Sequence, residues 1–333
     1  MRQGYRGEYG LTFNGGSEKG DYYVSLGYLN EKGYVIKSDY ERMTGRINVN
    51  TTPKKWMRTG LNLSGTMTES NVASSGGTSY VNPFFFTRNM GPIYPVYAHD
   101  PLTGAYLEDP STGGKVYDLG NLPGLPARPA GASPGRHVVA ETNWNDDLFK
   151  RNVLGARTYV DFLFLDGFKF TINLAADVTA YNASGYENKI VGDGAPAGRG
   201  EKVNTTTTGY TVNQLLNYSK TFDVHSVEAL LGHENYDYTY DYFRGFRQGQ
   251  IVDGNTELVN FTTTNSLTSY QDKYRTEGYF TRVSYNYNQK YFISGSYRRD
   301  GSSKFYKDTR WGDFYSVSAA WRMDAENFIK ALS

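Results

Sequence analysis

Four tyrosines stand at alternate positions in the run NYDYTYDYF, which covers residues 235–243. Alternate residues of an extended strand point to the same face, so Tyr236, Tyr238, Tyr240 and Tyr242 form a ladder of rings. Flat aromatic faces that carry a hydroxyl can stack on sugar rings, and these four are our candidate substrate-binding residues. The rings would serve equally well in packing on neighbouring strands or on a partner protein.

A second group of residues is charged and lies on the polar parity of alternating segments. Its members are Arg42, Arg46, Arg58, Arg157, Lys169, Asp177, Arg282 and Arg298. If the segments are strands of a closed wall, these side chains face the lumen and contact a plug or a polar solute. For any single residue, a generic wet interior wall explains the charge as well.

Catalytic chemistry finds little support in the sequence. Two of the four histidines, His225 and His233, share a strand face but lie eight residues apart, roughly 26 Å at strand rise, and cannot share a metal. The chain contains no G-x-S-x-G, no H-E-x-x-H and no phosphate-binding glycine loop. Cysteine is absent, which excludes a thiolate metal site. We therefore expect no enzyme, no metal and no cofactor.

The elements that position these groups are strands with one apolar and one polar face. Residues 168–180 alternate, with Phe168, Ile172 and Leu174 on one parity and Lys169 on the other. About ten such residues cross a bilayer when the strand is tilted. Segments of this kind lie near residues 8–14, 21–30, 38–50, 56–69, 152–164, 168–180, 206–219, 223–238, 274–287, 291–299 and 313–322.

The links between these eleven segments alternate in length. Asp166-Gly167, Ser219-Lys220 and Asn288-Gln289 are predicted tight hairpin turns. The long links lie near residues 70–151, 182–204, 239–272 and 301–312. Periplasmic turns and long outer loops are typical of outer-membrane β-barrels. Aromatic residues of the apolar parity flank the turns, as in an interfacial girdle: Phe164, Phe168, Tyr218, Tyr287 and Tyr291.

The alternation predicts which way the side chains face in such a barrel. On the convex, lipid-facing side we expect Leu61, Leu63, Phe170, Ile172, Leu174, Val283, Ile293 and Val317. Facing inward we expect Asn62, Lys169, Thr171, Arg282 and Ser318.

The composition of the chain agrees with a membrane barrel. The net charge of +1 gives no basic field for nucleic acid. A mean hydropathy of −0.60 would normally indicate a soluble protein, but a barrel wall needs only alternate residues to be apolar. The 30 tyrosines and 37 glycines favour an aromatic-belted, all-β protein, and no apolar run is long enough for a transmembrane helix.

The sequence thus predicts one domain over residues 1–333, an all-β, antiparallel up-and-down transmembrane barrel with long extracellular loops. The link at 70–151 exceeds an ordinary connection and is rich in aromatic residues, so we expect it to be folded, functional and extracellular. Bacterial single-chain barrels have an even number of strands, and no signal peptide precedes the first segment. We therefore expect a partial barrel from a longer precursor, with its first and last strands not paired to each other.

Three stretches resemble a known family. They read RNMGPIYPVYAHD at 88–100, YRRDGSSKF at 297–305 and RWGDFYSVSAAWR at 310–322. Together they resemble the barrel of SusC/RagA-type TonB-dependent transporters of the Bacteroidota, from about residue 8 to the C-terminus. The resemblance implies a plugged 22-stranded barrel that imports glycans or oligopeptides, with a SusD-like surface lipoprotein and the TonB complex as partners. The sequence shows no plug and no TonB-binding segment, which such a transporter needs.

The leading hypothesis is a barrel segment of a nutrient importer in the outer membrane, in contact with lipid and not with nucleic acid. The alternative is a passive porin or an adhesin-type barrel that needs no plug. An outer-membrane hydrolase is weakest, because no nucleophile and base are paired in the sequence. Substrate identity is not readable from these residues.

Overall fold

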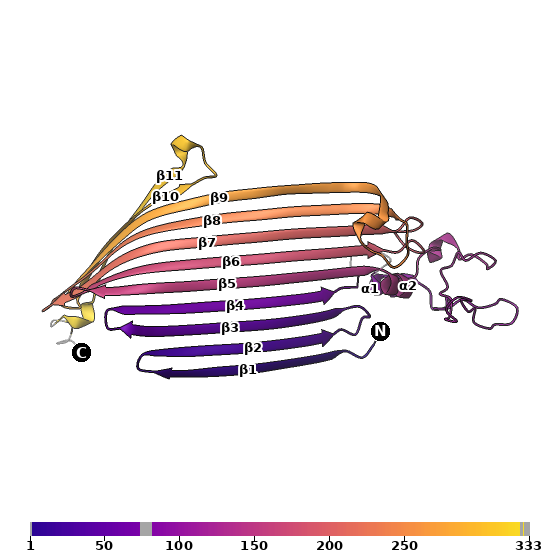
Figure 1. Ribbon diagram of the computed structural model, residues 1–333, viewed down its shortest axis with the longest axis horizontal. Helices are drawn as coiled ribbons and strands as arrows, with labels where there is room; N and C mark the ends of the chain where they lie inside the picture. The colour runs from indigo at the N-terminus through magenta and orange to yellow at the C-terminus, as the bar shows by residue number, and fades with distance from the viewer. Residues whose placement is uncertain (1, 74–81, 327–328, 330–333) are drawn as a thin grey trace.

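The computed structural model describes residues 2–73, 82–326 and 329. Eleven strands form a single sheet in which every strand pairs antiparallel with its neighbours in sequence, in the order β1 to β11 (Figure 1). The strands are β1 Tyr5–Ser17, β2 Gly20–Lys32, β3 Asp39–Lys54, β4 Met57–Asn71, β5 Asp146–Phe164, β6 Phe168–Glu187, β7 Arg199–Phe222, β8 His225–Gln250, β9 Phe261–Tyr287, β10 Tyr291–Ser302 and β11 Trp311–Trp321. The predicted all-β, up-and-down fold is confirmed.

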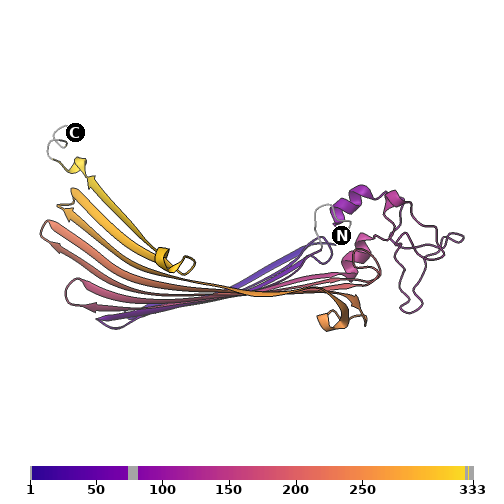
Figure 2. The same ribbon diagram turned by 90° about the horizontal axis from the view of Figure 1, so that it is seen from above.

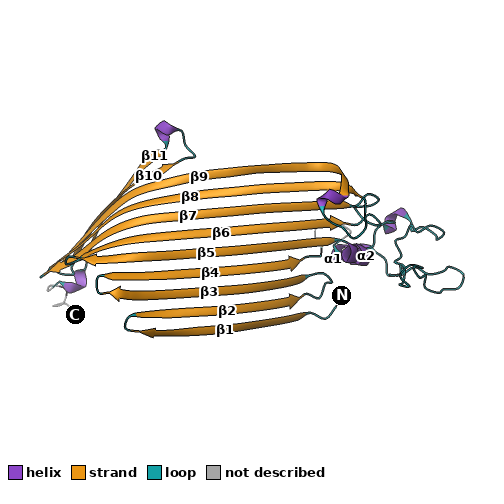
Figure 3. Cartoon of the chain, in the orientation of Figure 1, coloured by secondary structure: helices purple, strands orange, loops and turns teal. Residues whose placement is uncertain are grey.

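The helices are short and lie outside the sheet, in the links and after the last strand (Figure 3). They are α1 Pro83–Asn89, η1 Ala130–Ala132, α2 Val138–Trp144, η2 Leu258–Asn260, η3 Lys307–Thr309 and η4 Met323–Ala325. Within the described part of the chain, no helix is long and apolar enough to span a membrane.

The predicted separation of turns and loops is confirmed. The turns that join β5 to β6, β7 to β8 and β9 to β10 lie at one end of the sheet, which we call the tight-turn end (Figure 1). The described part of the β4–β5 link, residues 82–145, and the links at 188–198 and 251–260 lie at the opposite, loop end. An up-and-down sheet gives this result because each strand reverses the chain direction.

Two of the three predicted turns are in place and one is wrong. Asn288 and Gln289 both have positive φ, 52° and 53°, as a type I′ turn requires. Asp166-Gly167 form a turn together with Leu165. Ser219-Lys220 do not turn: β7 continues to Phe222, because the ladder to β8 pairs Ser219 with Glu228 and closes only at Asp223. Asp223 takes a positive φ of 54°, which a short polar side chain tolerates.

Several strands extend well into the predicted long loops. The loop expected at 239–272 shrinks to residues 251–260, and the one at 182–204 shrinks to 188–198. Polar and aromatic residues continue to alternate through these stretches, so the hydrogen-bond ladder continues as well. At strand rise, the 26 residues of β8 span about 85 Å, far more than the roughly 30 Å of a bilayer core. β8 is therefore much longer than a bilayer crossing requires.

The strand register separates the side chains into two faces. Directly paired residues share a face, and Phe162, Phe170, Leu216 and Leu231 form one continuous row across β5 to β8. Every residue predicted to face lipid lies on this apolar face, and every residue predicted to face inward lies on the opposite, polar face. This division is confirmed, while the assignment of the apolar face to the convex side stays a prediction.

The sheet is open in the structure. Strands β1 and β11 are its two edges and are not paired with each other in the described residues. Figure 2 shows the sheet strongly bent and twisted, with β10 and β11 turned away from the rest. The prediction that the terminal strands do not pair with each other is confirmed.

The long link between β4 and β5 is folded over its described residues, 82–145. A small apolar core joins Leu119 and Ala140 of this link to Val191, which comes from the link between β6 and β7 and is 1% exposed. The link begins at residue 72 and ends at 145, because β4 and β5 pair further than the sequence predicted, up to Asn71 and Leu148. The long link is therefore fixed to the loop end of the sheet.

Candidate functional site

The tyrosine ladder lies on the polar face in the loop half of β8. Its neighbour β9 adds two tyrosines, because Tyr238 pairs with Tyr274 and Tyr242 pairs with Tyr270. We call Tyr236, Tyr238, Tyr240, Tyr242, Tyr270 and Tyr274 the tyrosine cluster. The register places all six side chains on the same face as the charged residues predicted to line a lumen.

The rings of the tyrosine cluster pack on one another. The centroids of Tyr238 and Tyr274 are 4.8 Å apart, and those of Tyr242 and Tyr270 are 5.0 Å apart. Tyr236 lies 5.9 Å from Tyr274 and Tyr240 lies 6.0 Å from Tyr270. These separations fall in the range of roughly 4.5–7 Å where aromatic pairs attract. Since the β8 rings are only half-buried and Tyr270 is 53% exposed, the cluster still presents ring faces to solvent.

Small residues on β7 leave space beside the cluster. Thr205, Thr207, Gly209 and Thr211 lie opposite the four tyrosines of β8. A Cβ at Gly209 would stand 3.0 Å from the hydroxyl of Tyr236, so the ring packs closely over this glycine of β7. The result is a shelf of aromatic rings bordered by threonine hydroxyls.

The charges next to the tyrosine cluster are paired. Arg244 of β8 forms an ion pair with Glu201 of β7. The ammonium of Lys304 lies 4.7 Å above the ring of Tyr274 and 3.6 Å from Asp272. The shelf therefore offers aromatic faces and hydroxyls, with no strong net charge beside it.

The sequence predicted the tyrosines of β8 but missed Tyr270 and Tyr274. Both are on one parity of the run SYQDKY, four residues apart with Asp272 between them, so a strand would place them on the same face. Tyr270 lies in the stretch 239–272 that the sequence predicts to be a loop, and Tyr274 is the first residue of the predicted strand at 274–287. Only the register of the long β8–β9 pair brings the six rings together.

All eight charged residues predicted to face the lumen lie on the polar face. Some have partners within the sheet: Arg157 is 3.0 Å from Asp177, Arg42 is 3.3 Å from Glu8, and Arg298 is 2.7 Å from Asp300. Among the described residues, the remaining four form no ion pair, and these are Arg46, Arg58, Lys169 and Arg282.

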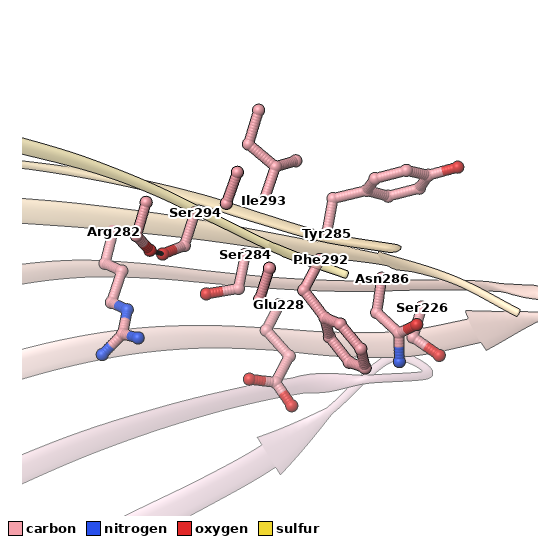
Figure 4. Close-up of a pocket in the computed structure, with 12 residues that line it drawn as sticks. Ser226, Glu228, Arg282, Ser284, Tyr285, Asn286, Phe292, Ile293 and Ser294 are labelled. Carbon is pink, nitrogen blue, oxygen red and sulfur yellow. Dashed lines mark hydrogen bonds between the residues drawn. The ribbon is translucent and has the colours of Figure 1, made fainter. Parts of the chain in front are cut away.

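A hollow of about 360 Å³ opens near the tight-turn end of β8 to β11. Arg282 and Glu228 line it together with serines of the polar face. Figure 4 shows Arg282, Glu228 and Phe292 pointing to one side of the strands, and Ile293 and Tyr285 pointing to the other. The separation of polar and apolar side chains onto two faces thus continues to the tight-turn end of the sheet.

The histidines do not assemble a metal site. His233 is 2.8 Å from Gln214 and 3.1 Å from Glu277, whereas His225 is 2.6 Å from the hydroxyl of Tyr285. In the part of the chain that the structure describes, no three histidine, aspartate or glutamate side chains are grouped to hold a metal ion.

A buried charge cluster fixes the long link to its neighbour. The Glu141 side chain is fully buried; it accepts a hydrogen bond of 2.8 Å from the backbone N–H of His137 and pairs with Arg136, which also pairs with Asp193 of the β6–β7 link. The imidazole Nδ1 of His137 accepts from the N–H of Ala140 and caps α2. Burial raises the pKa of Glu141 and lowers the pKa of His137.

The fold is that of an outer-membrane β-barrel wall: a long antiparallel sheet with one apolar and one polar face, tight turns at one end and longer, folded loops at the other. Among solved structures it is similar to the RagAB peptide transporter, with a TM-score of 0.76, 21% identity, and coverage of 98% of this chain and 35% of that one. It is also similar to the ferric citrate transporter FecA, with a TM-score of 0.53, 9% identity, and coverage of 96% of this chain and 38% of that one. These likenesses support the fold.

Curated sequences make the resemblance more specific. The chain is 28% identical over 335 residues to TonB-dependent receptor P3 of Formosa agariphila, covering 96% of this chain and 30% of the receptor. It is 25% identical over 325 residues to TonB-dependent receptor SusC of Bacteroides thetaiotaomicron, covering 96% of this chain and 31% of SusC. No protein-family model matches the chain. The resemblance to SusC/RagA-type TonB-dependent transporters is confirmed, and the chain spans about a third of the length of these relatives.

Proposed function

We propose that the chain forms part of the barrel wall of an outer-membrane importer that takes up glycans or oligopeptides by TonB-driven transport. The observation that carries this proposal is the sheet itself, whose two faces, turns and loops fit a barrel wall, combined with its resemblance to SusC over nearly the whole chain. A SusD-like surface lipoprotein would act at the loop end. The TonB complex would act through a region outside these 333 residues.

The exposed apolar face supports a position in the membrane. Leu11, Phe13, Leu154 and Val317 are 60%, 58%, 56% and 78% exposed, and they belong to one continuous apolar face. Apolar surfaces of this extent mark a contact with lipid or protein. Phe168 and Tyr218, with centroids 4.6 Å apart, belong to the aromatic border at the tight-turn end, as a membrane–water interface favours.

The tyrosine cluster is the proposed substrate contact. It lies on the polar face and beyond the reach of the hydrocarbon layer, on a path that a solute would take into the barrel. Ring faces and threonine hydroxyls suit sugar rings, and the same surface suits the side chains of a peptide. The absence of a strong net charge beside the shelf favours neutral substrates over acidic ones.

The test uses the complete transporter that carries this segment, reconstituted in lipid. Tyr238→Ala together with Tyr242→Ala should weaken binding of the transported oligosaccharide or oligopeptide at least tenfold, measured by calorimetry over a panel of both classes. Tyr238→Phe with Tyr242→Phe keeps the rings and should retain most of the affinity. Tyr210→Ala, on the apolar face of β7, is the matched control and should change nothing. Equal affinity of the double alanine variant and the wild type for the substrate would show that the tyrosine cluster does not contact it.

A passive porin or an adhesin-type barrel is the alternative. The energy dependence of uptake distinguishes this alternative from the importer. Uptake that stops when the inner-membrane proton gradient is dissipated supports the importer. Uptake that continues unchanged supports a passive pore.

A further inference from the structure

The apolar face carries a groove of about 420 Å³ across β6 to β10. Its origin is one short side chain in a row of long ones: Thr281 lies between Leu231 and Tyr297, in the row that also contains Phe170 and Leu216. Because threonine is smaller than its neighbours, the row has a dip there. The volume lies in the range of roughly 300–1,000 Å³ that ligand pockets occupy.

A polar rim closes the groove on the side of the loop end. In the next row, His233 stacks on Tyr279 with centroids 4.6 Å apart, and its Nδ1 lies 2.8 Å from the amide oxygen of Gln214. The carboxylate of Glu277 lies 3.1 Å from His233 Nε2 and accepts a hydrogen bond of 2.7 Å from the Tyr279 hydroxyl. The groove is thus apolar along its length and hydrogen-bonding at one end.

The rim continues onto the neighbouring strands as an aromatic and ionic border. Trp311 of β11 lies 6.2 Å from Tyr279, and the guanidinium of Arg299 lies 5.6 Å above the Trp311 ring. Arg299 is also 3.8 Å from Asp313. Aromatic rings with polar tips gather where a membrane meets water. On β8 to β11, the rim therefore marks the level at which the apolar face leaves the hydrocarbon.

We propose that this groove binds one acyl chain of a sugar-headed lipid of the outer leaflet, with the sugar hydroxyls held at the rim by Glu277, His233 and Gln214. This inference rests on the proposed function, which puts the apolar face in lipid. The polar rim lies towards the loop end, so a lipid in the groove points its head outward. The rim offers hydrogen-bond acceptors, and its nearby cation Arg299 is paired, which matches hydroxyl groups better than a free anionic head.

The test measures lipid retention by the complete transporter purified in detergent, by native mass spectrometry. The probes are dephosphorylated lipid A, which is an uncharged disaccharide carrying acyl chains, and phosphatidylglycerol, whose head is anionic, as a competitor. Thr281→Trp fills the dip, and we expect at least a fivefold loss of retained lipid A. Thr281→Val keeps the branched shape and should retain it. Glu277→Gln together with His233→Ala should lower the preference for lipid A over phosphatidylglycerol.

Several outcomes overturn the inference. If the wild-type protein retains no lipid A, the inference is wrong, whether or not the variants fold. It is also wrong if the Thr281→Trp protein folds and retains as much lipid A as the wild type. A dimer that disappears in Thr281→Trp while lipid is unaffected identifies a second copy as the occupant. If the folded transporter binds substrate but no lipid, this inference is contradicted and the proposed function is not. If the protein does not insert into the membrane, both are contradicted.

Discussion

At the scale of single residues, small side chains decide where large ones can lie. Gly209 leaves room for the Tyr236 ring, and Thr281 opens the groove on the opposite face. Neither effect is visible in the sequence, because each depends on which residue the register places alongside. The polar or apolar parity of a residue, in contrast, is readable directly, and the eight charged residues expected on one face are all there.

The buried pair of ionisable groups in the long link predicts a pH dependence. When the β4–β5 link is packed against the β6–β7 link, the pKa of His137 is lowered. Below a pH of about 6.5, His137 therefore binds a proton when the two links separate but not when they are packed together. The packing of the two links, which we call docking, weakens as the pH falls below that value. The pKa of Glu141 is raised, so a fall in pH towards that raised value relieves the cost of burying the carboxylate and opposes the effect.

Hydrogen exchange of residues 138–144 measures this dependence. We expect protection to fall between pH 7 and pH 5.5, and to stay constant over that window in His137→Asn, which keeps a capping oxygen but does not titrate. Protection that falls equally in both proteins would show that His137 is not the responsible group.

At the scale of elements, alternation predicts all eleven strands, although Leu230 breaks the pattern in β8. Residues 168–180 predict a strand because apolar and polar residues alternate there with Ala175 as the one exception, and β6 begins at Phe168 as expected. The ends of strands were harder to predict, because the ladder of β8 and β9 extends through a polar stretch that looks like a loop. The turn at 219–220 was misplaced because a Ser-Lys pair carries little turn signal, while Asp223 takes the positive φ.

The turn at Asn288-Gln289 predicts a stabilising substitution. Gln289 holds a φ of 53°, a conformation that costs a side-chain-bearing residue roughly 1–2 kcal/mol. Gln289→Gly should raise the free energy of unfolding by up to about 1 kcal/mol, less the added chain entropy of glycine. Urea titration of the reconstituted transporter measures the change. Gln289→Pro removes positive φ altogether and should destabilise the protein.

The apolar face predicts a penalty that depends on the side of the sheet. Ile172→Arg should cost roughly 2–4 kcal/mol of barrel stability if the residue lies near the bilayer midplane. Thr66→Arg places the same charge on the polar face of β4, opposite Thr44 and Val153, and should cost much less. Reversible unfolding in phospholipid vesicles gives both values. Equal costs would contradict the assignment of faces.

At the scale of the whole molecule, the open sheet exposes two edges. Strands β1 and β11 each present a row of backbone donors and acceptors, which is a template for pairing with another chain. In lipid, each unsatisfied group costs several kcal/mol. Expressed as these 333 residues alone, the chain should aggregate and give no ion conductance in a planar bilayer. Discrete conductance steps from this chain would show that the two edges can close into a small barrel.

The central claim is that one face of this sheet meets lipid while the other meets water. The chain contains no cysteine, so single cysteines can be placed one at a time along residues 168–177 and spin-labelled in the complete transporter in lipid. We predict that collision rates with oxygen, which partitions into lipid, are high at even positions such as Phe170, Ile172 and Leu174. Collision rates with a water-soluble nickel chelate should be high at odd positions such as Lys169 and Asn173. Equal exposure of both parities to the nickel chelate would contradict the account.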